Sequence, residues 1–201
     1  CDRPCEPACR RGRVETEPVA ICRLKRVAAD YKGDITARLP VPPQHATGRR
    51  VACVGAGPAS LTVARDLALA GHAVTVFDAE AQAGGFIRFQ IPRFRLPESV
   101  IDEEVGYILD LGVEARLGRR VDSLRALLHD GFDAVFVGCG APRGRDLRVP
   151  GREEAAANIH IGLDWLASVS FGHVKAIGRR VLVLGGGNTA MDCCRSARRL
   201  G

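Results

Sequence analysis

The residues best suited to chemistry are the glycines of the run at 54–60, which reads VGAGPAS. The run follows a short apolar segment and precedes a stretch of helical periodicity, which is the setting of a dinucleotide-binding turn of the G-x-G-x-x-small type. In such a turn Gly55 permits the tight bend and Gly57 lets a pyrophosphate reach the backbone. The third position must be small where helix and strand touch, and Ser60 stands there in place of the usual glycine or alanine.

An acidic residue about 20 positions after such a turn completes the pattern, because its carboxylate accepts the ribose hydroxyls. Asp78 stands at that place, at the end of the next apolar segment. The start of the helix that follows the turn also offers free N–H groups and a positive dipole end to phosphates. Together these features favour dinucleotide binding over a purely structural glycine turn.

A second turn of the same kind occurs at 184–190, which reads LGGGNTA. One Rossmann unit uses one such turn, so two turns about 130 residues apart predict two dinucleotides. The residue that would choose between NADH and NADPH in the second unit is expected beyond Gly201.

A separate set of cysteines opens the chain, with Cys1, Cys5 and Cys9 spaced four apart and Cys22 following. Closely spaced thiolates on a polar loop are typical iron–sulfur or zinc ligands in a reduced compartment. Disulfides or unrelated surface thiols are the alternative. The other four cysteines lie within apolar or glycine-rich α/β patterns, which fits reduced thiols in a cytoplasmic protein; they are Cys53, Cys139, Cys193 and Cys194.

Strands and helices that alternate along the chain must position these turns. Apolar segments predict buried strands at 51–54, 73–77, 133–137 and 181–184, and helical periodicity predicts helices at 58–70, at 97–111 and from about Asn188. Alternation of this kind predicts an α/β fold with a parallel sheet.

The composition excludes several classes of protein. Hydrophobic residues make up 46% and charged residues 26%, and the formal charge of +6 is carried by arginines scattered along the sequence, so no nucleic-acid partner is expected. No apolar run approaches the roughly 20 residues that a membrane span requires, so no membrane partner is expected. No Ser-His-Asp or metal-hydrolase arrangement occurs, and no catalytic side chain is predicted. The chain begins with cysteine rather than methionine, so we expect its true N-terminus to be missing.

Two further runs lie between the glycine turns, AGG at 83–85 and QIPRFRLP at 90–97. With them the chain resembles the small subunit of glutamate synthase and the related N-terminal region of dihydropyrimidine dehydrogenase, from Cys1 to Gly201. The resemblance implies a Rossmann-like FAD-binding unit with an inserted NADPH-binding unit, preceded by a small helical, cysteine-rich iron–sulfur segment. The family usually has glycine where Gln90 stands.

The resemblance also implies which residues bind. FAD contacts would fall on the first turn and the loops beside it, at Gly55, Gly57, Asp78, Gly85, Arg88 and Gly140. Ser60, the small third position of the turn, is predicted from the motif itself to belong to the same cofactor site. The phosphates of the nicotinamide cofactor, NADPH or NADH, would face Gly185, Gly187, Asn188 and Thr189. Cys1, Cys5 and Cys9 would share [4Fe–4S] clusters with further cysteines upstream. Cys22 would be either a fourth ligand or a buried thiol.

These implications divide the chain into an incomplete iron–sulfur segment at 1–37, a linker at 38–49, an incomplete FAD unit at 50–155 and the start of an NAD(P) unit at 156–201. The implied function is electron transfer from NAD(P)H through FAD and iron–sulfur clusters to a large catalytic subunit, that of glutamate synthase or a similar one. An electron-input subunit of another oxidoreductase and a non-catalytic dinucleotide-binding fragment are the alternatives, with a zinc-stabilised module a weaker one.

Overall fold

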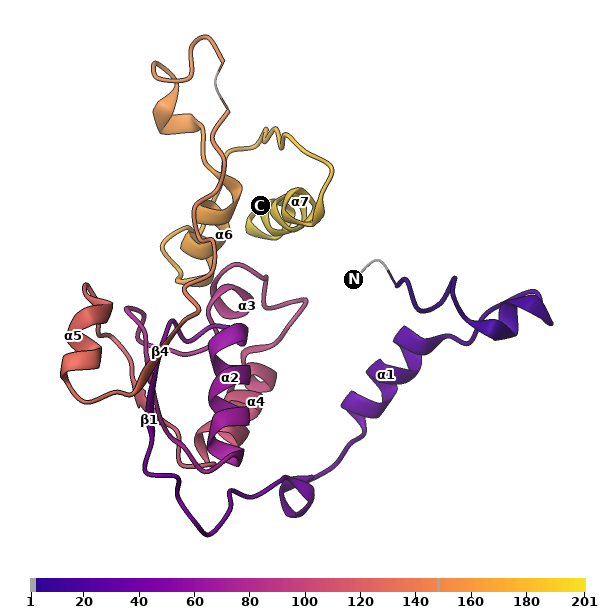
Figure 1. The fold of residues 1–201 in the computed structure, drawn as a ribbon. Coiled ribbons are helices and arrows are strands. Elements are labelled where there is room, and N and C mark those ends of the chain that lie inside the picture. The colour runs from indigo at the N-terminus through magenta and orange to yellow at the C-terminus, as the bar shows by residue number, and fades with distance from the viewer. Residues whose placement is uncertain (1–2, 148) are drawn as a thin grey trace. The chain divides into compact units, whose positions relative to one another are not determined.

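The computed structural model describes residues 3–147 and 149–201, and Cys1 therefore lies outside the described residues. The chain divides into two compact units, the first ending at Leu39 and the second spanning Pro40–Gly201. Each unit is described by itself (Figure 1). None of the helices in the described parts is long and apolar enough to cross a membrane.

The first unit consists of three short helical pieces: η1 (Arg10–Arg13), α1 (Ile21–Asp30) and η2 (Thr36–Arg38). The Glu6 carboxylate accepts a hydrogen bond from the Cys22 backbone N–H at 3.0 Å and so satisfies one of the free donors at the start of α1. None of the residues described in this unit is buried, and Leu24 and Val27 on α1 are more than half exposed. The unit therefore has no apolar core of its own within the described residues.

The second unit is built on a parallel sheet in the order β3-β2-β1-β4. Its strands are β1 (Arg50–Val54), β2 (Ala73–Phe77), β3 (Glu114–Arg116) and β4 (Ala134–Val137), and all three neighbouring pairs run parallel. The predicted strands at 51–54, 73–77 and 133–137 are thus confirmed. The predicted parallel α/β fold is confirmed with them.

Helices cover both faces of this sheet. Figure 1 shows α2 (Pro58–Leu69) and α4 (Glu98–Leu109) on one side and α5 (Leu124–His129) on the other. The β1 side chains alternate accordingly: Cys53 packs with α2 and α4, whereas Ala52 and Val54 pack with Leu127 of α5. This two-sided burial is why the strands read as continuous apolar runs in the sequence.

The remaining helices are α3 (Phe86–Phe89), η3 (Ala156–Asn158), α6 (Gly162–Ser170) and α7 (Asn188–Leu200). α6 and α7 pack on each other through Trp165, Leu166, Cys193 and Ala197. The helix predicted from about Asn188 is confirmed.

The predicted strand at 181–184 is wrong in this structure. The segment lies outside any strand or helix, and Leu182 and Leu184 are 83% and 69% exposed. A β-strand needs a neighbour to which its N–H and C=O groups can bond, and no strand lies beside this segment among the described residues. The second Rossmann unit and the iron–sulfur segment remain predictions.

Candidate functional site

The first glycine turn joins β1 to α2 in a conformation that requires glycine at its first position. The Gly55 N–H donates to the Phe77 carbonyl at 2.7 Å, which ties the turn to the end of β2. Gly55 has φ +98°, and a Cβ at this residue would lie 2.5 Å from the Gly138 carbonyl oxygen. The close approach of the β1 and β4 ends therefore leaves no room for a side chain.

The AGG loop at 83–85 lies directly against this turn. The Gly84 N–H donates to the Ala56 carbonyl at 2.8 Å. Gly85 has φ +54°, and a Cβ on it would lie 2.7 Å from the Gly57 Cα. The backbones of the glycine turn and of the AGG loop are thus in direct contact.

Gly57 itself has open space beside it. A Cβ on Gly57 would meet its nearest heavy atom, the Gly85 Cα, only at 4.0 Å. Gly57 also caps the N-terminus of α2, and no side chain caps that end. An uncapped helix start with open space at its glycine fits a phosphate, because the free N–H groups and the helix dipole both favour an anion there. These residues therefore fit the pyrophosphate of a dinucleotide.

Asp78 extends the same site from the end of β2. Its Oδ2 accepts a hydrogen bond from the Ala56 N–H, and its Oδ1 accepts one from the Glu80 N–H at 2.9 Å. The carboxylate therefore lies beside the glycine turn, as a ribose-binding acid must.

The Arg88 side chain is buried inside the protein and is not exposed toward a ligand. It is 5% exposed, and its Nε donates to the Ala83 carbonyl while one terminal nitrogen pairs with Asp102 Oδ1 at 2.6 Å. The guanidinium thus braces the AGG loop from within the protein. Its role as an FAD contact stays a prediction.

Ser60 shows why the third position of the turn must be small. It is fully buried, and a Cβ added at Gly138 would overlap its Oγ. The end of β4 is fixed in that place by the Gly138 N–H, which donates to the Val54 carbonyl at 2.8 Å. Gly140 follows in the same loop, with nothing within 4 Å of its Cβ position. The β1, β2 and β4 ends therefore place Gly55, Asp78 and Gly140 on one edge of the sheet.

The second turn has nearly the same backbone at its helix start. Gly187 caps α7 with φ −83° and ψ 178°, and Gly57 caps α2 with φ −82° and ψ 177°. Neither cap is closed by a side chain. Asn188 is exposed at the first position of α7 and Thr189 is half-buried, so the turn at 185–189 presents the same kind of uncapped helix start.

The described cysteines of the first unit form an incomplete ligand set. Partial burial raises the pKa of the Cys22 thiol, and the neighbouring Cys5 thiol and Glu6 carboxylate raise it further. Hydrogen bonds from the Val19 and Arg11 backbone N–H groups lower the pKa of Cys9. Among the described residues no three Cys, His, Asp or Glu side chains form a metal-binding group, and the seven described cysteines are free thiols.

Comparison with known proteins places the chain in a family. The family described as pyridine nucleotide-disulphide oxidoreductase matches residues 49–201. The chain belongs to this family. The matched range contains both glycine turns and the whole sheet, so the family accounts for the part of the chain that carries the candidate dinucleotide sites.

Curated relatives match the whole chain, including the following two. NADPH-Fe(3+) oxidoreductase subunit beta of Geobacter sulfurreducens is 38% identical over 100% of this chain and 30% of its own length. Glutamate synthase [NADPH] small chain of Mycobacterium tuberculosis is 36% identical over 100% of this chain and 44% of its own length. The resemblance to glutamate synthase small subunits is thus confirmed, and this chain spans less than half the length of either relative.

A solved structure shares the fold. Mycobacterium tuberculosis FprA in complex with NADPH has a TM-score of 0.62 at 23% identity, over 73% of this chain and 36% of its own. At that level of identity the likeness concerns the arrangement of the chain alone.

Sequence reasoning missed two residues that shape the site. Gly138 was visible as the glycine that ends a predicted strand, but its contact with Ser60 depends on the strand order. Gly84 belongs to the AGG run, yet only the folded chain shows that it bonds to Ala56. For Gly138 the available signal was its place directly after a predicted strand, because the ends of parallel strands converge on one edge of the sheet.

Proposed function

We propose that this chain is the dinucleotide-binding part of an NAD(P)H-dependent FAD oxidoreductase that passes electrons to a partner subunit. The observation that carries the proposal is the pair of uncapped helix starts at Gly57 and Gly187, which have nearly identical backbone angles on one chain. Two such sites suit two dinucleotides, and an electron-transfer flavoprotein of this kind uses FAD and NADPH or NADH.

In this proposal the first turn and the loop that packs on it hold FAD. Gly55 and Gly85 form the close-packed backbone, Gly57 leaves room for the pyrophosphate, and Asp78 accepts the ribose hydroxyls. Ser60 keeps the helix close to β4, Arg88 braces the AGG loop, and Gly140 lies where β4 ends on the same edge. The nicotinamide cofactor's phosphates fall to Gly185, Gly187, Asn188 and Thr189.

The chemistry belongs to the bound groups. FAD, when bound, can accept a hydride from a reduced nicotinamide and release electrons singly. The chain's own residues bind, orient and support, and the proposal assigns no side chain the role of a general acid or base.

The iron–sulfur part of the proposal rests on the first unit. We assign Cys1, Cys5 and Cys9 as candidate ligands of [4Fe–4S] clusters, with Cys22 either a fourth ligand or a buried thiol. Backbone N–H groups directed at a sulfur, as at Cys9, stabilise a thiolate and tune a cluster's potential. The proposal includes a cytoplasmic location, where thiols stay reduced.

The partner subunit that receives the electrons decides which enzyme this chain would serve. The proposal favours a glutamate synthase large subunit, in line with the Mycobacterium tuberculosis relative. The Geobacter sulfurreducens relative is named as a beta subunit of a different NADPH oxidoreductase, which favours an electron-input subunit of another enzyme as the second candidate.

An anaerobic visible spectrum with iron and zinc assays tests the proposal, on this chain and on a version extended to the length of its relatives. Flavin bands and a broad iron–sulfur shoulder, bleached by NADPH, are the expected result for the extended protein. A colourless extended protein that contains zinc or no metal would contradict the proposal. Asp78→Asn should lower FAD affinity by roughly 10- to 150-fold, since one charge-assisted hydrogen bond contributes about 1.5–3 kcal/mol.

Reoxidation of the NADPH-reduced protein separates the two candidate partners. Reoxidation by a glutamate synthase large subunit with its substrates, but not by Fe(III) alone, supports the first candidate. Rapid reoxidation by Fe(III) and none by the large subunit supports the second candidate.

A further inference from the structure

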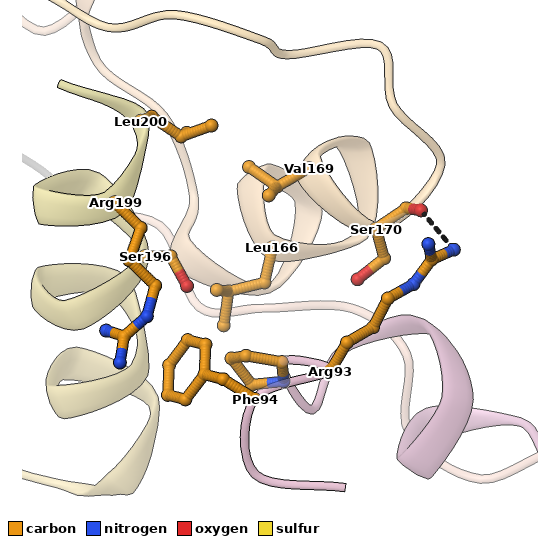
Figure 2. A pocket seen from close by; sticks show the side chains of 9 residues that line it. Arg93, Phe94, Leu166, Val169, Ser170, Ser196, Arg199 and Leu200 are labelled. Atoms are coloured by element: carbon orange, nitrogen blue, oxygen red, sulfur yellow. Dashed lines mark hydrogen bonds between the residues drawn. The ribbon is translucent and has the colours of Figure 1, made fainter. Parts of the chain in front are cut away.

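The loop between α3 and α4 is fastened to α6 and α7 by several of its side chains. The Arg93 guanidinium donates to the Ser170 carbonyl at 3.1 Å (Figure 2). The Phe94 ring lies beneath the Arg199 guanidinium, 3.9 Å from ring centroid to Cζ. One residue further on, Arg95 pairs with Asp192 of α7 at 2.6 Å. Only a small cavity remains between the loop and the two helices.

Among these contacts, the Arg95–Asp192 ion pair is the one that involves a buried carboxylate. The Asp192 side chain is 7% exposed and that of Arg95 is 36% exposed. A buried carboxylate left without its cation loses far more than a surface ion pair contributes, because it has already lost its water. The position of α7 is therefore tied to the presence of Arg95.

This pair lies on a continuous path between the two glycine turns. Gly57 of the first turn packs against Gly85, which caps α3, and the loop that follows α3 carries Arg95. Asp192 lies one helical turn after Asn188, at the start of the helix that Gly187 caps. The second turn is thus braced against the first through a few rigid elements.

We propose that Arg95 and Asp192 are positioning residues that fix the second turn relative to the first, and so align the nicotinamide ring with the flavin. This inference rests on the proposed function. A hydride moves only between atoms about 3–3.5 Å apart in the right orientation, and an error of about 1 Å can lower the rate by about a hundredfold. The pair therefore acts on the transfer step and leaves the binding of each dinucleotide to its own turn.

The test compares Asp192→Asn and Arg95→Gln with the parent, all extended to the length of the relatives. We expect unchanged FAD content, an unchanged dissociation constant for NADP+ and a flavin-bleaching rate with NADPH that is about 10- to 100-fold lower. The double variant should be no slower than the slower single variant, because both single changes remove the same interaction. Asp122→Asn is the matched control, since Asp122 pairs with Arg120 at 2.9 Å where both side chains are about 80% exposed.

Hydrogen–deuterium exchange supplies a readout that needs no flavin. Asp192→Asn should speed exchange in α6, α7 and the 90–97 loop, and leave β1 and β2 unchanged. A bleaching rate equal to the parent's, FAD lost in proportion to the rate, or exchange that rises equally throughout the sheet would each overturn the positioning role. A parent that binds no FAD would contradict the proposed function, while the exchange pattern would still decide whether the pair fixes α7.

Discussion

Gly85 lies so close to Gly57 that a Cβ on Gly85 would stand 2.7 Å from the Gly57 Cα. The contact is not symmetrical, because a Cβ on Gly57 would stand 4.0 Å from the Gly85 Cα. The protein therefore needs glycine at Gly85 for its own packing, whereas space at Gly57 is left for something else. Substitutions at the two residues separate folding from ligand binding.

Gly57→Ala should bind FAD much more weakly without a loss of stability. Gly57 has φ −82° and ψ 177°, an extended conformation that any residue adopts, so the methyl group meets only the ligand. Gly85→Ala should lower the free energy of unfolding by about 1–3 kcal/mol, because its φ of +54° is strained for alanine and its Cβ has no room. Thermal unfolding of the apoprotein and FAD content after gel filtration check both. Full FAD retention in Gly57→Ala, and in the bulkier Gly57→Val, would contradict the proposal that the pyrophosphate binds at Gly57.

Asp102→Ala should destabilise the protein although Asp102 is largely exposed. Its partner Arg88 has a side chain only 4% exposed, while that of Asp102 is 63% exposed, so the change leaves a buried guanidinium without its carboxylate. We expect a loss of about 1–3 kcal/mol in urea unfolding. Asp66→Ala is the control, because the Arg65–Asp66 pair is exposed on both sides and should contribute less than about 1 kcal/mol. Equal losses in the two variants would show that the Arg88 pair has no special part in bracing the AGG loop.

The features that could be predicted from the sequence depend on residues that lie close together along the chain. Strands β1, β2 and β4 and the turn at Gly55 could be predicted because buried parallel strands read as apolar runs and the turn has a fixed glycine spacing. The short strand β3 was not predicted, because it has only three residues, two of them charged, and none of them is buried. Asp78 followed from its distance to that turn, and the structure places it beside Ala56.

Contacts between distant segments could not be predicted. Arg88 was identified as a ligand contact through family resemblance, but its orientation depends on Asp102, which lies on the next helix. The segment at 181–184 has the composition of a buried strand, yet a strand forms only beside a partner, and Leu182 is exposed. Cysteine spacing indicated ligand chemistry, but spacing alone does not show that backbone N–H groups of Val19 and Arg11 bond to the Cys9 sulfur.

Ser60→Ala should leave the protein as stable as before or stabilise it by about 1 kcal/mol. The Ser60 Oγ is buried and has no hydrogen-bond partner among the described residues. A buried hydroxyl without a partner has lost its hydrogen bonds to water and gains none in the folded protein. Alanine removes that desolvation cost and keeps the small size that the turn requires. Ser60→Thr is the opposite test, since an added methyl group at a fully buried residue should destabilise by about 1–3 kcal/mol. Urea unfolding measures both, and a clear loss of stability in Ser60→Ala would mean that the hydroxyl does have a partner.

The buried thiols predict how stability depends on alkaline pH. Burial raises the pKa of Cys53 from 9.0 to about 11, and it does the same for Cys193 with help from Cys194 and Asp192. A group whose pKa is higher in the folded state stabilises the fold fully below its unfolded pKa, and this contribution is lost as the pH rises through the folded value. The free energy of unfolding should therefore fall between about pH 9 and pH 11, by at most about 3 kcal/mol per thiol.

Cys53→Ala isolates this effect from other groups that titrate in the same range. Cys53 is fully buried on β1, and this burial is the cause of its raised pKa. The variant should be less stable than the parent at pH 7, because a small cavity replaces the sulfur, and the difference should shrink as the pH rises to 11. Urea unfolding at pH 7, 9 and 10.5 measures the change. A constant difference across that range would show that the Cys53 thiol does not titrate with the fold.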